Sequence, residues 1–137
     1  MVELSIYKIE RGPRMNLKVI FKIDAIVALI NGLGLLFMTA TFLEAANFEA
    51  TKDLNTVGQF TGVTFLFLAL LTWRIPDIVK DGVNSLGRLY AIGHGLWFLI
   101  IGYHVLIGAA SGPTAWINII VTAIIGILYV TGSRKPD

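Results

Sequence analysis

The chain contains no cysteine among its 137 residues and only two histidines, His94 and His104. Without cysteine it can form no disulfide, no thiolate nucleophile and no metal or iron–sulfur site with Cys ligands. A bound metal or haem would depend on histidine, methionine or carboxylate side chains. Because there is no cysteine, the sequence also does not indicate whether the protein is in an oxidising or a reducing compartment.

Charge is scarce as well, with charged residues at 15% of the chain and a formal net charge of only +2. This charge is too small and too segregated along the chain for a nucleic-acid surface, which needs Lys and Arg clustered on one face. We therefore expect no nucleic-acid partner. Hydrophobic residues make up 55% of the chain, and the mean hydropathy of +0.75 lies outside the usual soluble range. Membrane lipid is the expected solvent.

Sequence motifs that carry catalysis are missing. The sequence has no Gly-rich phosphate loop, no His-x-x-x-His metal pair, no Gly-x-Ser-x-Gly elbow and no pair of carboxylates on one predicted helix. The prediction is a protein that is not an enzyme and has no cofactor. Catalysis would need a cofactor or a partner to supply the chemistry.

Four long apolar stretches dominate what is present. They cover residues 25–43, 57–73, 89–110 and 114–132, and none contains Asp, Glu, Lys or Arg. Each approaches the roughly 20 residues that a helix needs to cross about 30 Å of hydrocarbon. The sequence predicts an all-α integral membrane four-helix bundle, with one domain over residues 1–137. Pro76 is expected to end the second helix, and Pro113 suits the first turn of the fourth.

The basic residues are distributed unevenly between the loops. All of the 11 Lys and Arg residues except Lys52 fall before the first stretch, between the second and third, or after the fourth. Because positively charged loops resist translocation, both termini are predicted to be cytoplasmic. The membrane itself is predicted to be a bacterial inner (plasma) membrane. The alternative for the first stretch is a cleaved signal peptide ending near Ala45-Ala46, but the apolar run is long for a signal core.

The segment before the first stretch, residues 1–14, has three apolar residues at near-helical spacing followed by Gly12-Pro13. This pattern predicts either a short interfacial helix, with its basic residues near anionic lipid head groups, or a partly extended tail. Met15 begins a plausible shorter product, so the segment need not occur in every product.

Polar residues in or beside the apolar stretches are candidates for function, because polar groups in hydrocarbon are costly unless paired. Counting about 1.5 Å of rise per residue from each predicted interface places Asp24 level with Arg88. We expect an ion pair between these two side chains. The same count places Asn31 near the level of His94.

The two histidines lie ten residues apart on one predicted helix, about 15 Å apart along its axis and rotated by about 80°, so they cannot ligate one ion together. The favoured interpretation is that both are neutral and hydrogen-bond Asn31, Asn118, Gln59 or a backbone carbonyl. Alternatives are an axial haem pair of His104 and Met38, a single histidine beneath a pigment, a haem shared with a partner chain, and proton or substrate handling.

Small residues at four-residue spacing predict close helix packing, since they let backbones approach in lipid. They are Gly87, Ala91 and Gly95 in and beside the third stretch, and Gly58 and Gly62 in the second. Gly93 and Gly95 also flank His94, which predicts a flat face able to receive another helix or a planar ring.

The run LKVIFKIDAIVALINGLGLLF, the glycines of the second stretch and the short hairpin before the last stretch resemble small bacterial four-span proteins of the broad DoxX-like kind. The resemblance covers roughly residues 17–132 and rests on hydropathy and glycine placement. It implies a compact four-helix bundle, and no functional residue is transferred from it.

These observations lead to three functional hypotheses. The leading one is a non-catalytic accessory subunit of a larger integral membrane complex, for example a respiratory or photosynthetic one. The second is a small homo-oligomeric carrier or channel with a polar path through Asp24, Asn31, His94 and His104. The third is a protein that binds haem or a chlorophyll-type pigment.

Overall fold

The computed structural model describes residues 15–134, and these residues form five α-helices and no strand. The helices are α1 (Leu17–Phe37), α2 (Thr39–Glu44), α3 (Lys52–Ile78), α4 (Val83–Leu106) and α5 (Pro113–Gly132). All except α2 are long and apolar enough to cross a membrane, which confirms the prediction of a multi-pass membrane protein. The predicted interfacial helix in residues 1–14 lies outside the described residues.

The first apolar stretch differs from its predicted bounds at both ends. Helix α1 begins at Leu17 rather than near Ala25, because the Asn16 side chain accepts a hydrogen bond from the Lys18 amide at 2.9 Å and caps the helix. The stretch is then interrupted at Met38, whose φ of −129° and ψ of 37° are not helical. The predicted single helix over residues 25–43 is therefore wrong, and its last part is the separate helix α2.

The prediction that Pro76 ends the second long helix is also wrong, because α3 continues to Ile78. A proline in the last turn removes only its own amide bond to the carbonyl four residues earlier. The amide of Val79 still donates to the Ile75 carbonyl at 2.8 Å. Pro113 begins α5, as predicted.

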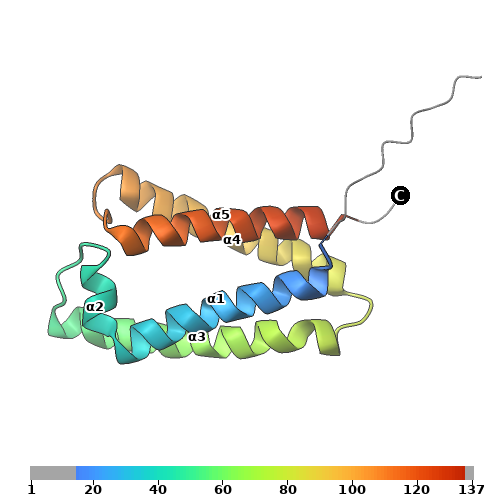
Figure 1. The fold of residues 1–137 in the computed structure, drawn as a ribbon, viewed down its shortest axis with the longest axis horizontal. Helices are drawn as coiled ribbons and strands as arrows, with labels where there is room; N and C mark the ends of the chain where they lie inside the picture. The colour runs from blue at the N-terminus through green and yellow to red at the C-terminus, as the bar shows by residue number, and fades with distance from the viewer. Residues whose placement is uncertain (1–14, 135–137) are drawn as a thin grey trace, which may run out of the picture.

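The long helices are arranged as two pairs, with α1 beside α3 and α4 beside α5 (Figure 1). The pairs meet mainly through α1 and α5. The start of α1, the end of α5 and the α3–α4 loop lie at one end of the molecule, and α2 lies at the other (Figure 1). We call these the basic end and the α2 end, since every described Lys and Arg except Lys52 lies toward the former.

Helices α1 and α3 approach closely through glycine. A Cβ added at Gly62 would stand 2.8 Å from the Leu36 backbone nitrogen, and one at Gly32 would stand 2.8 Å from a Leu66 methyl group. Gly58 is also buried and faces Thr39. Small residues thus bring the two backbones into contact, as the spacing in the second stretch predicts.

The small residues of α4 do not form one packing stripe. Gly87 lies against Ser133 and Leu17, and Ala91 packs on the core of the basic end. Gly95 is exposed, and no heavy atom lies within 4 Å of where its Cβ would stand. Within the described chain, the predicted stripe therefore serves packing only in the part nearer the basic end.

The basic end is closed by an apolar core that joins the two pairs. Its buried members are Leu17, Ile20, Phe21, Ile125 and Tyr129. The Phe21 and Tyr129 rings meet edge to face, with centroids 5.0 Å apart. Such pairs add stability beyond the area that they bury.

The α2 end is closed by polar contacts between two loops. The Thr114 amide donates to the Ala45 carbonyl at 3.1 Å, and the Asn47 side-chain amide donates to the Ser111 hydroxyl at 2.7 Å. Gly112 lies directly against the Ala45 carbonyl, where a Cβ would not fit. The two helix pairs are therefore held together at both ends.

Candidate functional site

A cavity of about 680 Å³ lies between the two helix pairs, and all four long helices and α2 contribute to its lining. On α4 the lining runs from Leu89 to His104, which corresponds to about 22 Å at 1.5 Å per residue. The cavity is therefore elongated along the helices. Its volume falls within the range of about 300–1,000 Å³ that is typical of small-molecule sites.

The lining is mainly apolar, with a limited set of polar side chains. The polar members are Asp24, Asn31, Thr61, Thr72, Tyr90, His94, His104, Thr114, Asn118 and Thr122. This composition is typical of sites that enclose an apolar ligand and orient it through a few hydrogen bonds.

One group of polar residues connects the two pairs near the basic end, and we call it the Asp24 cluster: Asp24, His94 and Tyr129. The Tyr129 hydroxyl donates to Asp24 Oδ2 at 2.9 Å, and His94 Nε2 lies 3.2 Å from the same oxygen. The exposed fraction is only 10% for the Asp24 side chain and 16% for the His94 side chain. Three helices, α1, α4 and α5, therefore share one buried carboxylate.

Aromatic contacts fix the orientation of this cluster. The His94 ring stacks on the Tyr129 ring with centroids 5.6 Å apart, and Tyr129 packs against Phe21 and Tyr90. The Tyr90 hydroxyl in turn shares a 2.9 Å hydrogen bond with the Thr72 hydroxyl of α3. Through these contacts every long helix supports the cluster.

The two contacts on Asp24 Oδ2 determine what hydrogen bonding remains. If Asp24 is ionised and His94 neutral, both the Tyr129 hydroxyl and His94 Nε2–H donate to the carboxylate, and Nδ1 carries a lone pair. Among the described residues Nδ1 is buried and has no partner. In that protonation state the cluster has no free donor, and any further hydrogen bond to it must be one that it accepts.

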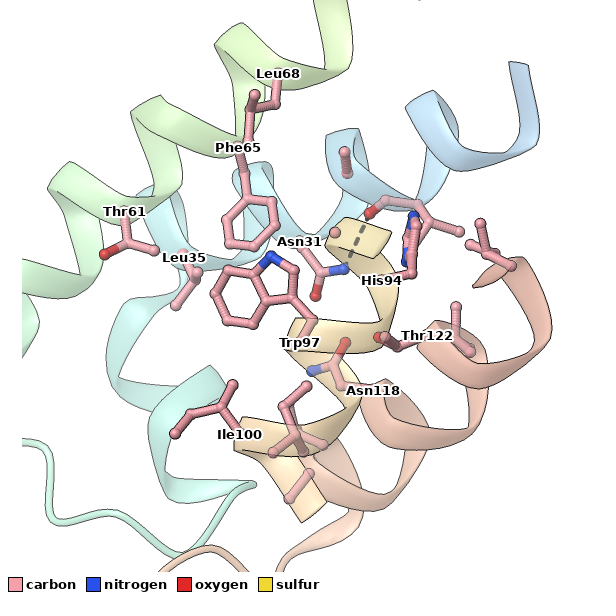
Figure 2. Close-up of a pocket in the computed structure, with 18 of the residues that line it drawn as sticks. Asn31, Leu35, Thr61, Phe65, Leu68, His94, Trp97, Ile100, Asn118 and Thr122 are labelled. Atoms are coloured by element: carbon pink, nitrogen blue, oxygen red, sulfur yellow. Dashed lines mark hydrogen bonds between the residues drawn. The ribbon is translucent and has the colours of Figure 1, made fainter. Parts of the chain in front are cut away.

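Further toward the α2 end, polar side chains from opposite pairs face each other. Figure 2 shows Asn31 and Asn118 pointing into the same space beside the Trp97 indole. The Asn31 amide nitrogen donates to the Val27 carbonyl at 3.1 Å. The Trp97 and Phe65 rings, on α4 and α3, lie with centroids 6.0 Å apart. This part of the cavity combines aromatic walls with two amides.

The predicted ion pair between Asp24 and Arg88 is not formed within the described residues. Asp24 contacts His94 and Tyr129, whereas Arg88 is exposed. Because α1 begins at Leu17, Asp24 lies two turns inside the helix rather than at its mouth, where the prediction placed it. His94 likewise pairs with Asp24, and Asn31 bonds to its own helix.

Tyr129 is the member of the cluster that the sequence analysis missed. It lies near the end of the fourth apolar stretch, and Tyr is common there in membrane proteins because its ring suits the membrane–water interface. A buried Tyr hydroxyl usually has a hydrogen-bond partner, so a Tyr within an apolar stretch could have been predicted to pair with a polar residue of another helix.

The structure does not bring His104 and Met38 together as an axial pair. His104 lines the cavity toward the α2 end, while Met38 is 61% exposed at the break between α1 and α2 and is not part of the lining. Within residues 15–134, no group of three or more His, Asp or Glu side chains is arranged to hold a metal ion.

Comparisons with protein-family models, with curated proteins and with solved structures found no match to this chain. The resemblance to DoxX-like proteins over residues 17–132 stays a prediction. The geometry of the cavity is therefore the main guide to function.

Proposed function

We propose that this protein is a four-helix bundle of the bacterial inner membrane that binds a small lipophilic molecule in its intramembrane cavity. The observation that carries the proposal is the elongated, mainly apolar cavity with the Asp24 cluster toward one end. This function belongs to the carrier class, and it needs no second copy because one chain supplies the cavity.

The positions of the basic residues support an orientation with both termini cytoplasmic. Lys18, Lys22, Arg74 and Arg134 lie toward the basic end, whereas Glu44, Glu49 and Asp53 lie toward the α2 end. Lys and Arg are retained on the cytoplasmic side during insertion. The α2 end is then exoplasmic.

The lining also indicates what kind of molecule would bind. Apolar walls favour an apolar body, while the polar side chains of the lining favour a molecule with at least one hydrogen-bonding group. Asp24, His94, Asn31 and Asn118 offer such contacts at two levels of the cavity.

Two glycines of α4 provide a matched test. Gly93 lines the cavity and Gly95 is exposed outside it, and neither has a heavy atom within 4 Å of where a Cβ would stand. Gly93→Leu therefore places a branched side chain in the cavity, and Gly95→Leu places the same side chain on the outer surface. Both changes have the same effect on helix propensity.

Native mass spectrometry of the protein released from lipid nanodiscs, prepared with its native lipid extract, provides the measurement. The wild type and Gly95→Leu are expected to carry a small-molecule adduct that Gly93→Leu lacks. An adduct retained equally by Gly93→Leu, or absent from the wild type, would contradict the proposal.

A second candidate function is the accessory subunit, and the exposed glycine on α4 favours it. The surface around Gly95 is free of contacts within the described chain, so a helix of another integral membrane protein can approach it closely. Mass analysis of proteins that accompany the chain in mild detergent tests this function. A monomer that purifies alone and keeps the small-molecule adduct would exclude it.

A further inference from the structure

Among the helices that line the cavity, only α3 and α4 contribute exposed lining residues; the other exposed lining residue is Phe48, in the loop after α2. The exposed lining residues on these helices are Leu68, Leu89, Trp97 and Ile100. On the opposite side, the lining contributed by α1 and α5 includes the buried residues Asp24, Leu35, Ala115 and Ile125. The cavity is partly open, and this difference in exposure places its opening between α3 and α4.

The packing of the helices agrees with an opening at this position. In the described part of the chain, α3 is packed along α1 and α4 along α5, but α3 and α4 are not packed along each other. The tilted contact between the Phe65 and Trp97 rings bridges them. The opening therefore lies between two helices whose outward-facing side chains are apolar, such as Leu70 and Leu99.

Contacts between the two helix pairs restrict both ends of the cavity. The apolar core around Phe21 and Tyr129 closes the basic end, and the contacts of Ala45 and Asn47 with the 111–114 loop close the α2 end. A molecule already dissolved in the bilayer meets the lateral opening directly.

We propose that the ligand is a neutral, hydroxyl-bearing lipid with an elongated apolar body, which matches the elongated and mainly apolar cavity and enters from the bilayer between α3 and α4. This inference rests on the proposed function. The head group is neutral because carrying a charge through hydrocarbon to this opening is costly. It bears a hydroxyl because an ionised Asp24, which lines the cavity, can accept a hydrogen bond in addition to those from Tyr129 and His94.

Trp97 provides a spectroscopic reporter for the test. It lines the cavity, and replacing Trp73 and Trp116 by Phe leaves it as the single tryptophan. In nanodiscs, a monoacylglycerol with a brominated chain is expected to quench Trp97 more than the same mole fraction of brominated phospholipid does. The excess quenching should disappear in the Gly93→Leu background and persist in Gly95→Leu. A brominated fatty acid, studied at a pH where it is an anion, should give no excess.

The route is tested with a reversible block, which the absence of natural cysteine makes specific. Leu68 lines the opening and is 41% exposed, while Leu70 is exposed on the same helix outside the lining. Each is changed to Cys and joined through a disulfide to a bulky thiol reagent. The label at position 68 should abolish the excess quenching until a reductant removes it, whereas the label at position 70 should have no effect.

The outcomes separate this inference from the proposed function. If the label at position 68 leaves the quenching unchanged, or if the anionic probe quenches as strongly as the neutral one, the route or the ligand class is wrong. The function stands in that case, provided that the native adduct still depends on Gly93. If neither a Gly93-dependent adduct nor excess quenching is found, both proposals are overturned.

Discussion

Removal of one hydroxyl tests the Asp24 cluster most directly. Tyr129→Phe keeps the ring that packs on Phe21 and His94 but removes the 2.9 Å hydrogen bond to Asp24 Oδ2. Tyr129 is fully buried, so water cannot readily replace the lost donor. We expect the change to lower the free energy of unfolding.

The size of the expected loss depends on whether the hydrogen bond joins two neutral groups or ends on a charged one. Hydrogen bonds between membrane helices contribute on average about 0.6 kcal/mol, whereas hydrogen bonds to a charged group contribute about 1.5–3 kcal/mol. Within residues 15–134, an ionised Asp24 accepts hydrogen bonds from Tyr129 and His94 alone, and losing one leaves His94 as its remaining partner there. We therefore expect a loss of about 1.5–3 kcal/mol.

Tyr90→Phe is the matched control for Tyr129→Phe. It removes a hydrogen bond of the same 2.9 Å length, but to the neutral hydroxyl of Thr72. The expected loss is about 0.6 kcal/mol. Reversible unfolding in bicelles, followed by steric trapping, measures both variants under one condition. Equal losses for the two variants would refute the argument that Tyr129 stabilises a buried charge.

Further predictions concern helix packing and the basic end. Gly62→Ala should destabilise the protein by about 1–3 kcal/mol in the same unfolding assay, because its Cβ would meet backbone atoms of α1. Gly95→Ala, which meets nothing, should be neutral or slightly stabilising, and a similar loss in both variants would show that the close packing of α1 and α3 is not the cause. Asp77→Asn breaks the 2.7 Å and 3.0 Å ion pairs with Lys18 and Lys22. Because Asp77 is exposed, the loss should be small and shrink as salt is added, and a large loss that is insensitive to salt would contradict this.

The positions of the four long helices could be predicted from the sequence, but the interior of the site could not. Hydropathy is a local property, so apolar runs without charge identify the spans wherever the neighbouring helices lie. A count of residues along a helix gives depth only and does not give rotation or tilt. Depth alone therefore predicts a pair of Asp24 with Arg88, whereas the folded chain brings Asp24 to His94 and Tyr129.

The glycines show the same division. Spacing identified Gly58, Gly62, Gly87 and Gly95 as able to allow close packing, and three of them lie against other residues of the chain. Which side of α4 meets a neighbour depends on how the α4–α5 pair is rotated against α1 and α3. This rotation leaves Gly95 on the outer surface of α4, where it contacts no other helix of the described chain.

The sequence by itself determined that the chain contains four long apolar helices, because lipid requires each backbone amide to bond within its own segment. It also determined which few polar residues lie within or beside those helices. Only the tertiary structure decided that α1 stops at Phe37, that three helices share the Asp24 carboxylate and that a cavity separates the two pairs. These features depend on contacts between residues far apart in the chain, and their geometry is set by the packing of whole helices rather than by any local pattern.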